Sequence, residues 1–333
     1  MTKGVVALLG SGETGPGMTK VHRALLSRIP DVRAVNLNTP YGFQENVDQM
    51  SQKLLDYFDT SLHLDVKNLD FRSFEDATEE ARAQFKAAVA GSSYVFAGPG
   101  SPSYALNQWT PLNLQEDLAT VIANGGTVCF SSAAALTLGA FTPPVYEIYK
   151  AGTGLAWLTG LDLMAAIGLR CVVLPHYNNA EGGNYDTSRC YIGERRLQIL
   201  EAALDPEVAV LGIDEHTAAV LDIEARTLTV QGKGECHWRF QGAISTFENG
   251  ATISFDELGA GAATIEAVAS PFPVATPAVD AAELAERDAR DQRLVATLEA
   301  VRGEARAQGN YAIADRLRDA LTDFGVAVRD GKA

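Results

Sequence analysis

The sequence predicts an α/β protein with a mostly parallel sheet flanked by helices, followed by a small C-terminal helical hairpin. Three observations lead to this fold class. Short apolar runs alternate with longer helix-like segments from the N-terminus, which is typical of a parallel sheet covered on both faces. Beyond residue 217 the runs are separated only by turn signals such as Gly232-Lys233-Gly234, which indicates antiparallel strands. A proline-rich stretch then separates this unit from a helical tail.

Each expected element follows from its apolar spacing and from the turn residues that bound it. The expected strands are Val5–Leu9, Val32–Leu37, Leu62–Val66, Tyr94–Ala97, Thr127–Phe130, Cys171–Leu174, Val208–Ile213, Ala218–Asp222, Thr227–Val230 and His237–Phe240. The expected helices are Lys20–Ser27, Gln44–Phe58, Glu75–Ala90, Leu112–Ala123 and Ile192–Ala203. The first four strands are each followed by a helix, and this repetition is what predicts the parallel sheet.

The composition is that of an ordinary globular protein: 333 residues, 47% hydrophobic and 21% charged. No apolar stretch reaches about 18 residues and the first strand is too short for a secretory signal, so we expect a cytoplasmic protein without a membrane span. The four cysteines lie far apart, which predicts reduced thiols and neither a disulfide framework nor a zinc site. The net charge of −15 argues against non-specific binding to nucleic acid.

The chain is expected to have three parts. Residues 1–266 form the α/β domain, and residues 267–280 form a linker, because the prolines at 271, 273 and 277 prevent regular structure. Residues 281–333 form the tail module, in which apolar residues recur at helical spacing over 281–303 and 304–324. The charges of the tail nearly balance, so RNA binding by the tail is disfavoured on electrostatic grounds and a packing role is preferred.

The strongest functional signal is the segment from Cys129 to Ala135. A buried strand ends in two serines and small residues follow, which is how α/β enzymes expose a serine nucleophile on a sharp strand-to-helix turn. The candidate nucleophile is Ser132, and an ordinary helix cap is the alternative interpretation. The N–H groups of Ala133 and of Gly100, in the loop Gly98-Pro99-Gly100, are candidate oxyanion donors.

A general base is expected at the carboxyl end of another strand, where α/β sheets bind their ligands. His176 directly follows the strand Cys171–Leu174 and is that candidate. Two carboxylates compete for the role of orienting the imidazole. Glu147 lies between serine and histidine in the sequence among bulky apolar residues, whereas Glu215 follows the strand Val208–Ile213. We take Glu147 as the acid and keep Glu215 open, with Glu215 and Asn178 as candidate substrate contacts. The glycine-rich loop 10–17 matches no phosphate-binding pattern, and no histidine has convincing metal-ligand spacing, so no cofactor or metal is expected.

These segments resemble the peptidase E / cyanophycinase family of serine peptidases, whose fold is class I glutamine amidotransferase-like. The likeness covers residues 3–245 and is carried by four segments: Ser131-Ser132-Ala133-Ala134-Ala135, Gly98-Pro99-Gly100-Ser101, Pro175-His176-Tyr177-Asn178-Asn179-Ala180 and Gly212-Ile213-Asp214-Glu215-His216-Thr217-Ala218. The resemblance implies a nucleophile at Ser132, an oxyanion loop at Gly98–Ser101 and a small peptide with an acidic residue as substrate. It also implies an arginine for the substrate carboxylate, for which Arg189 is the candidate, with a solvent-facing helix-start arginine as the alternative. A homodimer is expected from the resemblance alone.

Two departures from the family pattern raise a second hypothesis. Ala134 replaces the glycine of the elbow, and Pro99, which has no N–H, interrupts the oxyanion loop. The leading function is therefore amide-bond hydrolysis by a Ser-His-Glu triad, and the alternative is a catalytically silent binding protein whose tail recruits a protein or tRNA. The tail segment 302–326 resembles the C-terminal helical end of cysteinyl-tRNA synthetases, but the HIGH and KMSKS motifs are absent from the sequence.

Overall fold

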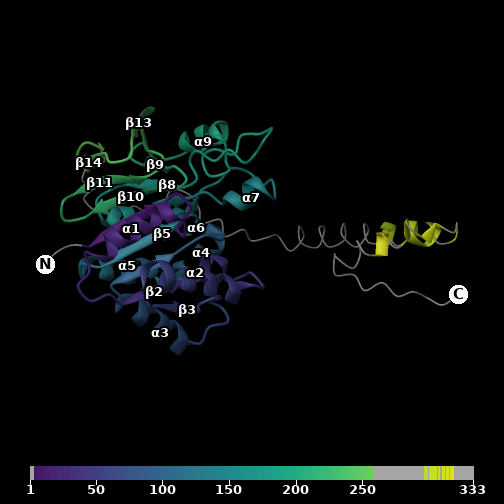
Figure 1. Ribbon diagram of the computed structural model, residues 1–333. Coiled ribbons are helices and arrows are strands. Elements are labelled where there is room, and N and C mark those ends of the chain that lie inside the picture. The colour runs from purple at the N-terminus through teal and green to yellow at the C-terminus, as the bar shows by residue number, and fades with distance from the viewer. Residues whose placement is uncertain are drawn as a thin grey trace. The chain divides into compact units, whose positions relative to one another are not determined.

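A computed structural model describes residues 4–258 and, in the tail, residues 296–298, 300–305, 307, 310–311, 313–314 and 316–318. Contacts divide the chain into two compact units, Met1–Ser270 and Pro271–Ala333 (Figure 1). The expected linker at 267–280 and most of the expected hairpin lie outside the described residues, and described residues between 296 and 318 are largely helical. None of the described helices is long and apolar enough to cross a membrane.

The larger sheet of the first unit has eight strands. Their order is β14 (Thr252–Ser254), β11 (Thr227–Gly232), β10 (Thr217–Asp222), β1 (Val5–Leu9), β5 (Thr127–Ser131), β4 (Tyr94–Ala97), β2 (Ala34–Leu37) and β3 (Val66–Leu69). Parallel pairing joins the five strands β1, β5, β4, β2 and β3, whereas antiparallel pairing joins β1, β10, β11 and β14. This confirms the predicted fold class and the change of pattern beyond residue 217.

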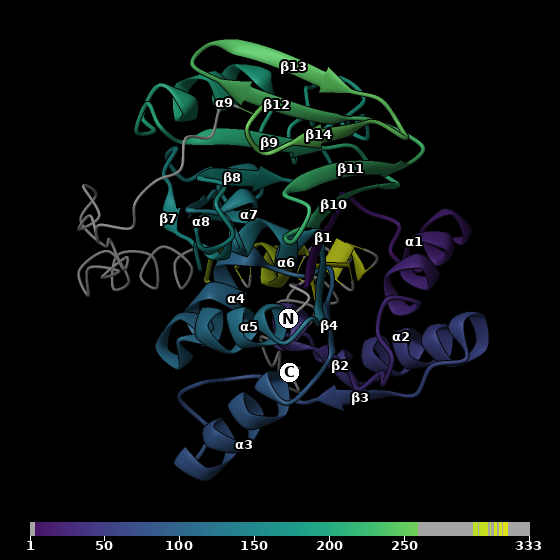
Figure 2. The same ribbon diagram turned by 90° about the vertical axis from the view of Figure 1, so that its left-hand side faces the viewer.

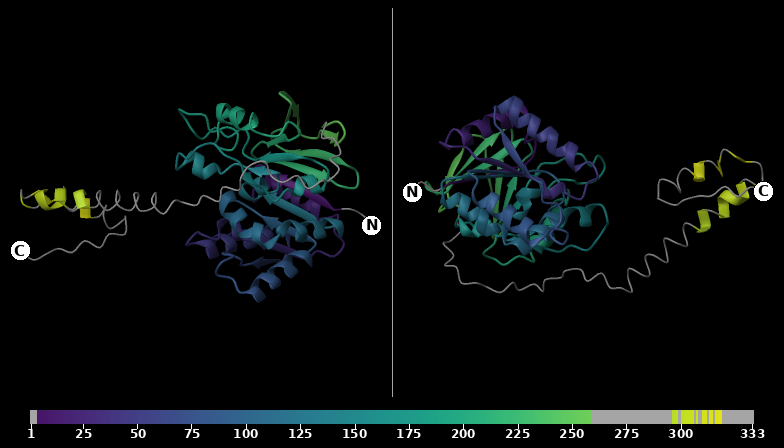
Figure 3. Two further views of the ribbon diagram at one scale, coloured as in Figure 1. Left: turned by 180° about the vertical axis from the view of Figure 1, so that it is seen from behind. Right: turned by 90° about the horizontal axis from the view of Figure 1, so that it is seen from below.

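Helices cover both faces of this sheet, as expected for parallel strands that are apolar on both sides. On one face lie α1 (Pro16–Leu26) and α2 (Val47–Leu62), and on the other lie α3 (Glu79–Ala90) and α5 (Leu114–Ala123) (Figure 2). The view from below shows the same separation (Figure 3). Alternate residues of β1 enter the two cores, because successive side chains of a strand point to opposite faces.

A second sheet has the order β13 (Ala243–Phe247), β12 (Cys236–Phe240), β9 (Ala209–Ile213) and β8 (Cys171–Leu174). Within it β8 and β9 are parallel neighbours, and α9 (Glu194–Glu201) packs against its apolar face through Leu197 and Leu200. The remaining described elements are α4 (Pro102–Trp109), α6 (Ala133–Thr137), α7 (Val145–Tyr149), α8 (Leu163–Ala166), the β6 (Phe141–Thr142) and β7 (Leu158–Thr159) pair, and 3-10 turns at Thr39–Tyr41 and Thr110–Leu112.

One predicted strand is wrong and several short elements are unpredicted. Residues 62–66 were expected to form a strand, but α2 continues to Leu62 and β3 begins only at Val66. The helix ends at His63, whose left-handed backbone (φ 53°) terminates the hydrogen-bond ladder. The apolar run at Leu62 and Leu64 therefore belongs to the end of the helix, and both side chains pack against the core beneath it.

Candidate active site

The candidate nucleophile stands on a sharp turn at the carboxyl end of a central strand. Ser132 follows β5 with backbone angles φ 51° and ψ −122°, and α6 begins at the next residue. Such angles are unfavourable for a residue with a side chain, and they persist where the surroundings fix them. Here the Ser132 N–H donates to the Leu9 carbonyl (3.1 Å), and the Ala134 N–H donates to the Gly98 carbonyl (3.3 Å). Ala134 is fully buried, so its methyl group is accommodated in the turn.

The candidate base contacts this serine. His176 follows β8, and its Nε2 lies 2.9 Å from the Ser132 Oγ. Its Nδ1 lies 2.8 Å from Oε1 of Glu215, which follows β9. Because an ionised carboxylate can only accept, Nδ1 carries the ring proton of the neutral histidine and Nε2 is free to accept the hydroxyl proton. The three side chains therefore form one continuous hydrogen-bonded chain.

The acid at the imidazole is Glu215, and Glu147 does not fill that position. Glu147 lies in α7, and its buried Oε2 has no hydrogen-bond partner among the described residues. The physical reason is topology: β8 and β9 are parallel neighbours, so their carboxyl ends place His176 and Glu215 side by side. Glu147 comes from a short helix instead of a strand end.

Two asparagines hold Glu215, one at its carboxylate and one at its backbone, and Asn179 was missed by sequence reasoning. The Asn179 Nδ2 donates to Glu215 Oε1 (3.0 Å), and the Glu215 N–H donates to Asn178 Oδ1 (2.9 Å). Asn178, expected to touch substrate, thus positions the acid. Burial alone would raise the pKa of the Glu215 carboxyl, but hydrogen bonds from His176 and Asn179 outweigh it and hold that pKa below its usual value of 4.5.

The glycine-rich loop after β1 contacts the segments that follow β8 and β9. The His176 N–H donates to the Gly10 carbonyl (3.1 Å), and a Cβ at Gly10 would lie 1.9 Å from the Asp214 carbonyl oxygen. Only glycine permits this close approach. Glu13 of the same loop accepts a hydrogen bond from Ser131 Oγ (2.9 Å), immediately before the nucleophile. The loop is therefore part of the framework that holds the candidate site.

The two candidate oxyanion donors have no competing acceptor. Within the described part of the chain, neither the Ala133 N–H nor the Gly100 N–H makes a hydrogen bond. Gly100 has a backbone angle φ of 148°, and a Cβ there would lie 2.0 Å from the Pro40 carbonyl oxygen. Two free amides beside a serine elbow are what an oxyanion hole requires. Pro99 does not interrupt the contact between loop and elbow, because the Gly98 carbonyl accepts from the Ala134 N–H.

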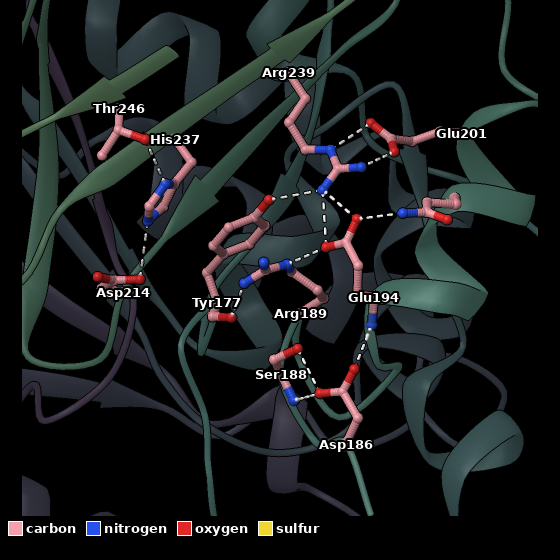
Figure 4. A network of polar contacts seen from close by, with 11 residues as sticks. Tyr177, Asp186, Ser188, Arg189, Glu194, Glu201, Asp214, His237, Arg239 and Thr246 are labelled. Atoms are coloured by element: carbon pink, nitrogen blue, oxygen red, sulfur yellow. Dashed lines mark hydrogen bonds and ion pairs between the residues drawn. The ribbon is translucent and has the colours of Figure 1, made fainter. Parts of the chain in front are cut away.

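Arg189, the candidate for a substrate carboxylate, already has an internal partner. Its Nε donates to Glu194 (2.7 Å), and another guanidinium nitrogen donates to the Tyr177 carbonyl (3.0 Å). Figure 4 shows it inside a network in which Arg239 joins Glu194 and Glu201. The charge of Arg189 is therefore paired within the protein, through two of its three guanidinium nitrogens.

One group of side chains among the described residues has the spacing of a metal site. The ligand atoms of Asp214, Glu235 and His237 lie within 4.8 Å of one another. His237 already contacts Asp214 through Nε2 and Thr246 through Nδ1, both at 3.2 Å (Figure 4). Asp214 also accepts from the Glu235 N–H (3.1 Å). These contacts link the end of β9 to β12.

The site is defined by hydrogen bonding and not by cavity size. Two surface hollows, of about 480 and 580 Å³, lie between α9 and β13 and between β3 and α3. Neither is lined by Ser132, His176 or Glu215. Since the chemistry lies at the strand ends, we locate the candidate active site there.

The fold is shared with the solved structure of a peptidase. The crystal structure of a peptidase from an acI-B1 Actinobacterium superposes with a TM-score of 0.61 at 21% identity, covering 76% of this chain and 98% of that one. A structure named "Putative Peptidase E Protein" from Listeria monocytogenes EGD-e aligns with a TM-score of 0.44 at 15% identity, over 74% of this chain and 98% of that one. No protein-family model and no curated protein matches the chain. The first neighbour establishes the α/β architecture that carries the site.

Proposed function

We propose that this chain is a serine peptidase or amidohydrolase that cleaves small peptides, with Ser132, His176 and Glu215 as its catalytic triad. The observation that carries the proposal is the hydrogen-bonded chain of 2.9 and 2.8 Å through the two nitrogens of His176. The shared architecture with a solved peptidase agrees with it.

The geometry supports acyl transfer in two steps. Ser132 Oγ attacks the substrate carbonyl carbon while His176 Nε2 takes the hydroxyl proton, and the N–H groups of Ala133 and Gly100 donate to the oxyanion. His176 then gives the proton to the leaving amine, the C–N bond breaks, and an ester remains on Ser132. A water molecule then attacks the ester carbonyl carbon as it gives a proton to His176, and His176 returns that proton to Ser132 Oγ as the ester bond breaks. Glu215 keeps the imidazole in the required tautomer throughout.

The decisive experiment combines an active-site label with a peptide panel. Wild-type protein should react with a fluorophosphonate and hydrolyse dipeptides, and Ser132→Ala should do neither. Absence of both reactions in folded wild-type protein would favour the silent binding protein instead. That second hypothesis keeps its basis in Ala134 and Pro99, and it predicts partner binding that Ser132→Ala leaves unchanged.

A further inference from the structure

Three consecutive residues near the site adopt a left-handed backbone that side chains disfavour. Arg189, Cys190 and Tyr191 have φ of 57°, 59° and 65°. Non-glycine residues visit this region singly, and a run of three persists only where surrounding contacts determine it. Backbone strain of this kind, close to candidate catalytic residues, points to a functional role for the side chains of the turn.

The turn is fastened to the segment that carries the candidate base. The Arg189 N–H donates to the Tyr177 carbonyl (2.8 Å), and the Cys190 N–H donates to the His176 carbonyl (3.2 Å). Arg189 is also tied through Glu194 to Arg239, which is only 7% exposed (Figure 4). The left-handed turn and His176 are thus held as one piece.

The turn places an aromatic ring against the imidazole. The ring of Tyr191 lies 5.7 Å from that of His176, the ring of Tyr149 lies 5.4 Å from Tyr191, and the ring of Tyr185 stacks 5.9 Å from Tyr149. The Tyr191 hydroxyl donates to Glu181 (3.3 Å), which fixes the orientation of the ring. These three residues, the tyrosine row, lead outward from His176 to Tyr185, which is 57% exposed.

The proposed reaction indicates which part of a peptide substrate would contact the tyrosine row. His176 must hand its proton to the leaving amine, so the residue that bears that amine lies beside the imidazole. Tyr191 is the ring of the row that lies next to the imidazole, whereas the Tyr149 ring already contacts the Tyr185 ring and the Lys150 ammonium, which lies 4.7 Å from its centroid. Arg189, the cation expected to bind an acidic side chain, is already paired with Glu194. Ring faces next to the leaving group suit an aromatic side chain.

We propose that Tyr191, with Tyr149 and Tyr185, forms a specificity subsite for an aromatic residue immediately after the scissile bond. This inference rests on the proposed serine-peptidase function. Stacking on one ring is expected to favour an aromatic leaving residue about 3- to 10-fold in kcat/KM over glycine or aspartate.

The test compares dipeptides that share one acyl residue and differ only in the leaving residue: phenylalanine, tyrosine, glycine or aspartate. Wild type should prefer the aromatic pair, Tyr191→Ala should lose that preference, and Tyr191→Phe should retain it. Tyr311→Ala, at an exposed tyrosine of the tail, is the matched control and should keep the wild-type preference.

Labelling of Ser132 by a fluorophosphonate separates the possible failures. A labelled, active enzyme with no aromatic preference, or with a preference that survives Tyr191→Ala, overturns the subsite alone. Folded wild-type protein that is neither labelled nor active overturns the proposed function and the subsite together.

Discussion

At the scale of single residues, the carboxylate that contacts His176 is not the one that lies between Ser132 and His176 in the sequence. The choice between Glu147 and Glu215 turns on which of them meets His176, and only Glu215 contacts Nδ1. Sequence alone showed that both are acids near apolar segments. It did not show that β8 and β9 are neighbours, which is a property of the folded sheet.

We expect Glu215→Gln to lower kcat by about 10²- to 10⁴-fold, because an amide no longer stabilises the imidazolium and can hold the wrong tautomer. Glu147→Gln is the matched control and should stay within about 3-fold of wild type, since a carboxylate outside the triad contributes no comparable electrostatic stabilisation. Steady-state peptide hydrolysis measures both variants. If Glu147→Gln lowered kcat more than Glu215→Gln did, Glu147 of α7 would be the acid instead.

The Glu215 carboxyl makes the stability of the fold depend on pH. Its pKa lies below the usual 4.5, so it is ionised at neutral pH and protonates only in more acidic solution. The fold therefore keeps the stabilisation from this group above pH 4.5 and loses it as the pH falls below that value. Denaturation of wild type and Glu215→Gln between pH 3 and 7 measures the difference, which should shrink toward the acid end.

His22 is a second acid-sensitive group, and it lies outside the proposed triad. Its ring is buried between the Tyr94 hydroxyl (2.7 Å) and the Glu13 carbonyl (2.9 Å), and burial lowers its pKa from 6.5 to about 4. Between these values the unfolded chain binds a proton that the folded chain excludes. Stability is thus complete above pH 6.5 and falls by about 3 kcal/mol as the pH drops to 4.

Urea denaturation across this pH range tests the role of His22. His22→Gln should flatten the slope between pH 4 and 6.5, whereas His63→Asn, at an exposed histidine in a left-handed position, should leave it unchanged. An unaltered slope in His22→Gln would show that another group carries the acid sensitivity.

At the scale of elements, strand ends were predictable and strand neighbours were not. Continuous apolar runs bounded by turns located β1, β4 and β8 at their observed bounds, because a run buried on both faces has few alternatives. The same reasoning failed at Leu62, where apolar residues close a helix. It also missed Tyr191 and Asn179, whose contacts with His176 and Glu215 arise from long-range packing that no local pattern encodes.

The ion pairs of Arg239 with Glu194 and Glu201 of α9 are expected to contribute strongly to stability. Arg239 is buried between Glu194 and Glu201, and its removal leaves the partly buried Glu201 carboxylate without its cation and Glu194 with Arg189 alone. Arg239→Met should cost about 3 kcal/mol in the free energy of unfolding. Arg33→Met is the control, because its pair with Asp31 is exposed and should contribute less than about 1 kcal/mol. Equal effects of the two variants would contradict the argument.

The oxyanion loop has its own test at a single glycine. Gly100→Ala forces a Cβ toward the Pro40 carbonyl at a backbone angle reserved for glycine, so the loop must move away from the elbow. We expect kcat to fall about 10²-fold or more. Gly17→Ala, whose Cβ would meet no atom within 4 Å, is the control for the substitution itself. Unchanged kcat in Gly100→Ala would remove Gly100 from the oxyanion hole.

At the scale of the whole molecule, every proposed catalytic residue belongs to the unit Met1–Ser270. A chain that ends at Ser270 should therefore keep the peptide hydrolysis of the full chain within about 3-fold, since the tail supplies none of the proposed triad or oxyanion groups. Specific activity of the two forms measures this. Loss of activity in a folded shortened chain would assign the tail a role in the chemistry.

The division of the site between two sheets has a mechanical consequence. Ser132 follows a strand of the eight-stranded sheet, whereas His176 and Glu215 follow strands of the four-stranded sheet. Glu215 lies in the short connection from β9 to β10, which joins the two sheets. A slight slip of one sheet past the other would lengthen the Ser132–His176 contact while every strand pairing stayed intact. On heating, turnover should therefore vanish reversibly at a lower temperature than the circular dichroism of the sheets, so that activity reports their alignment.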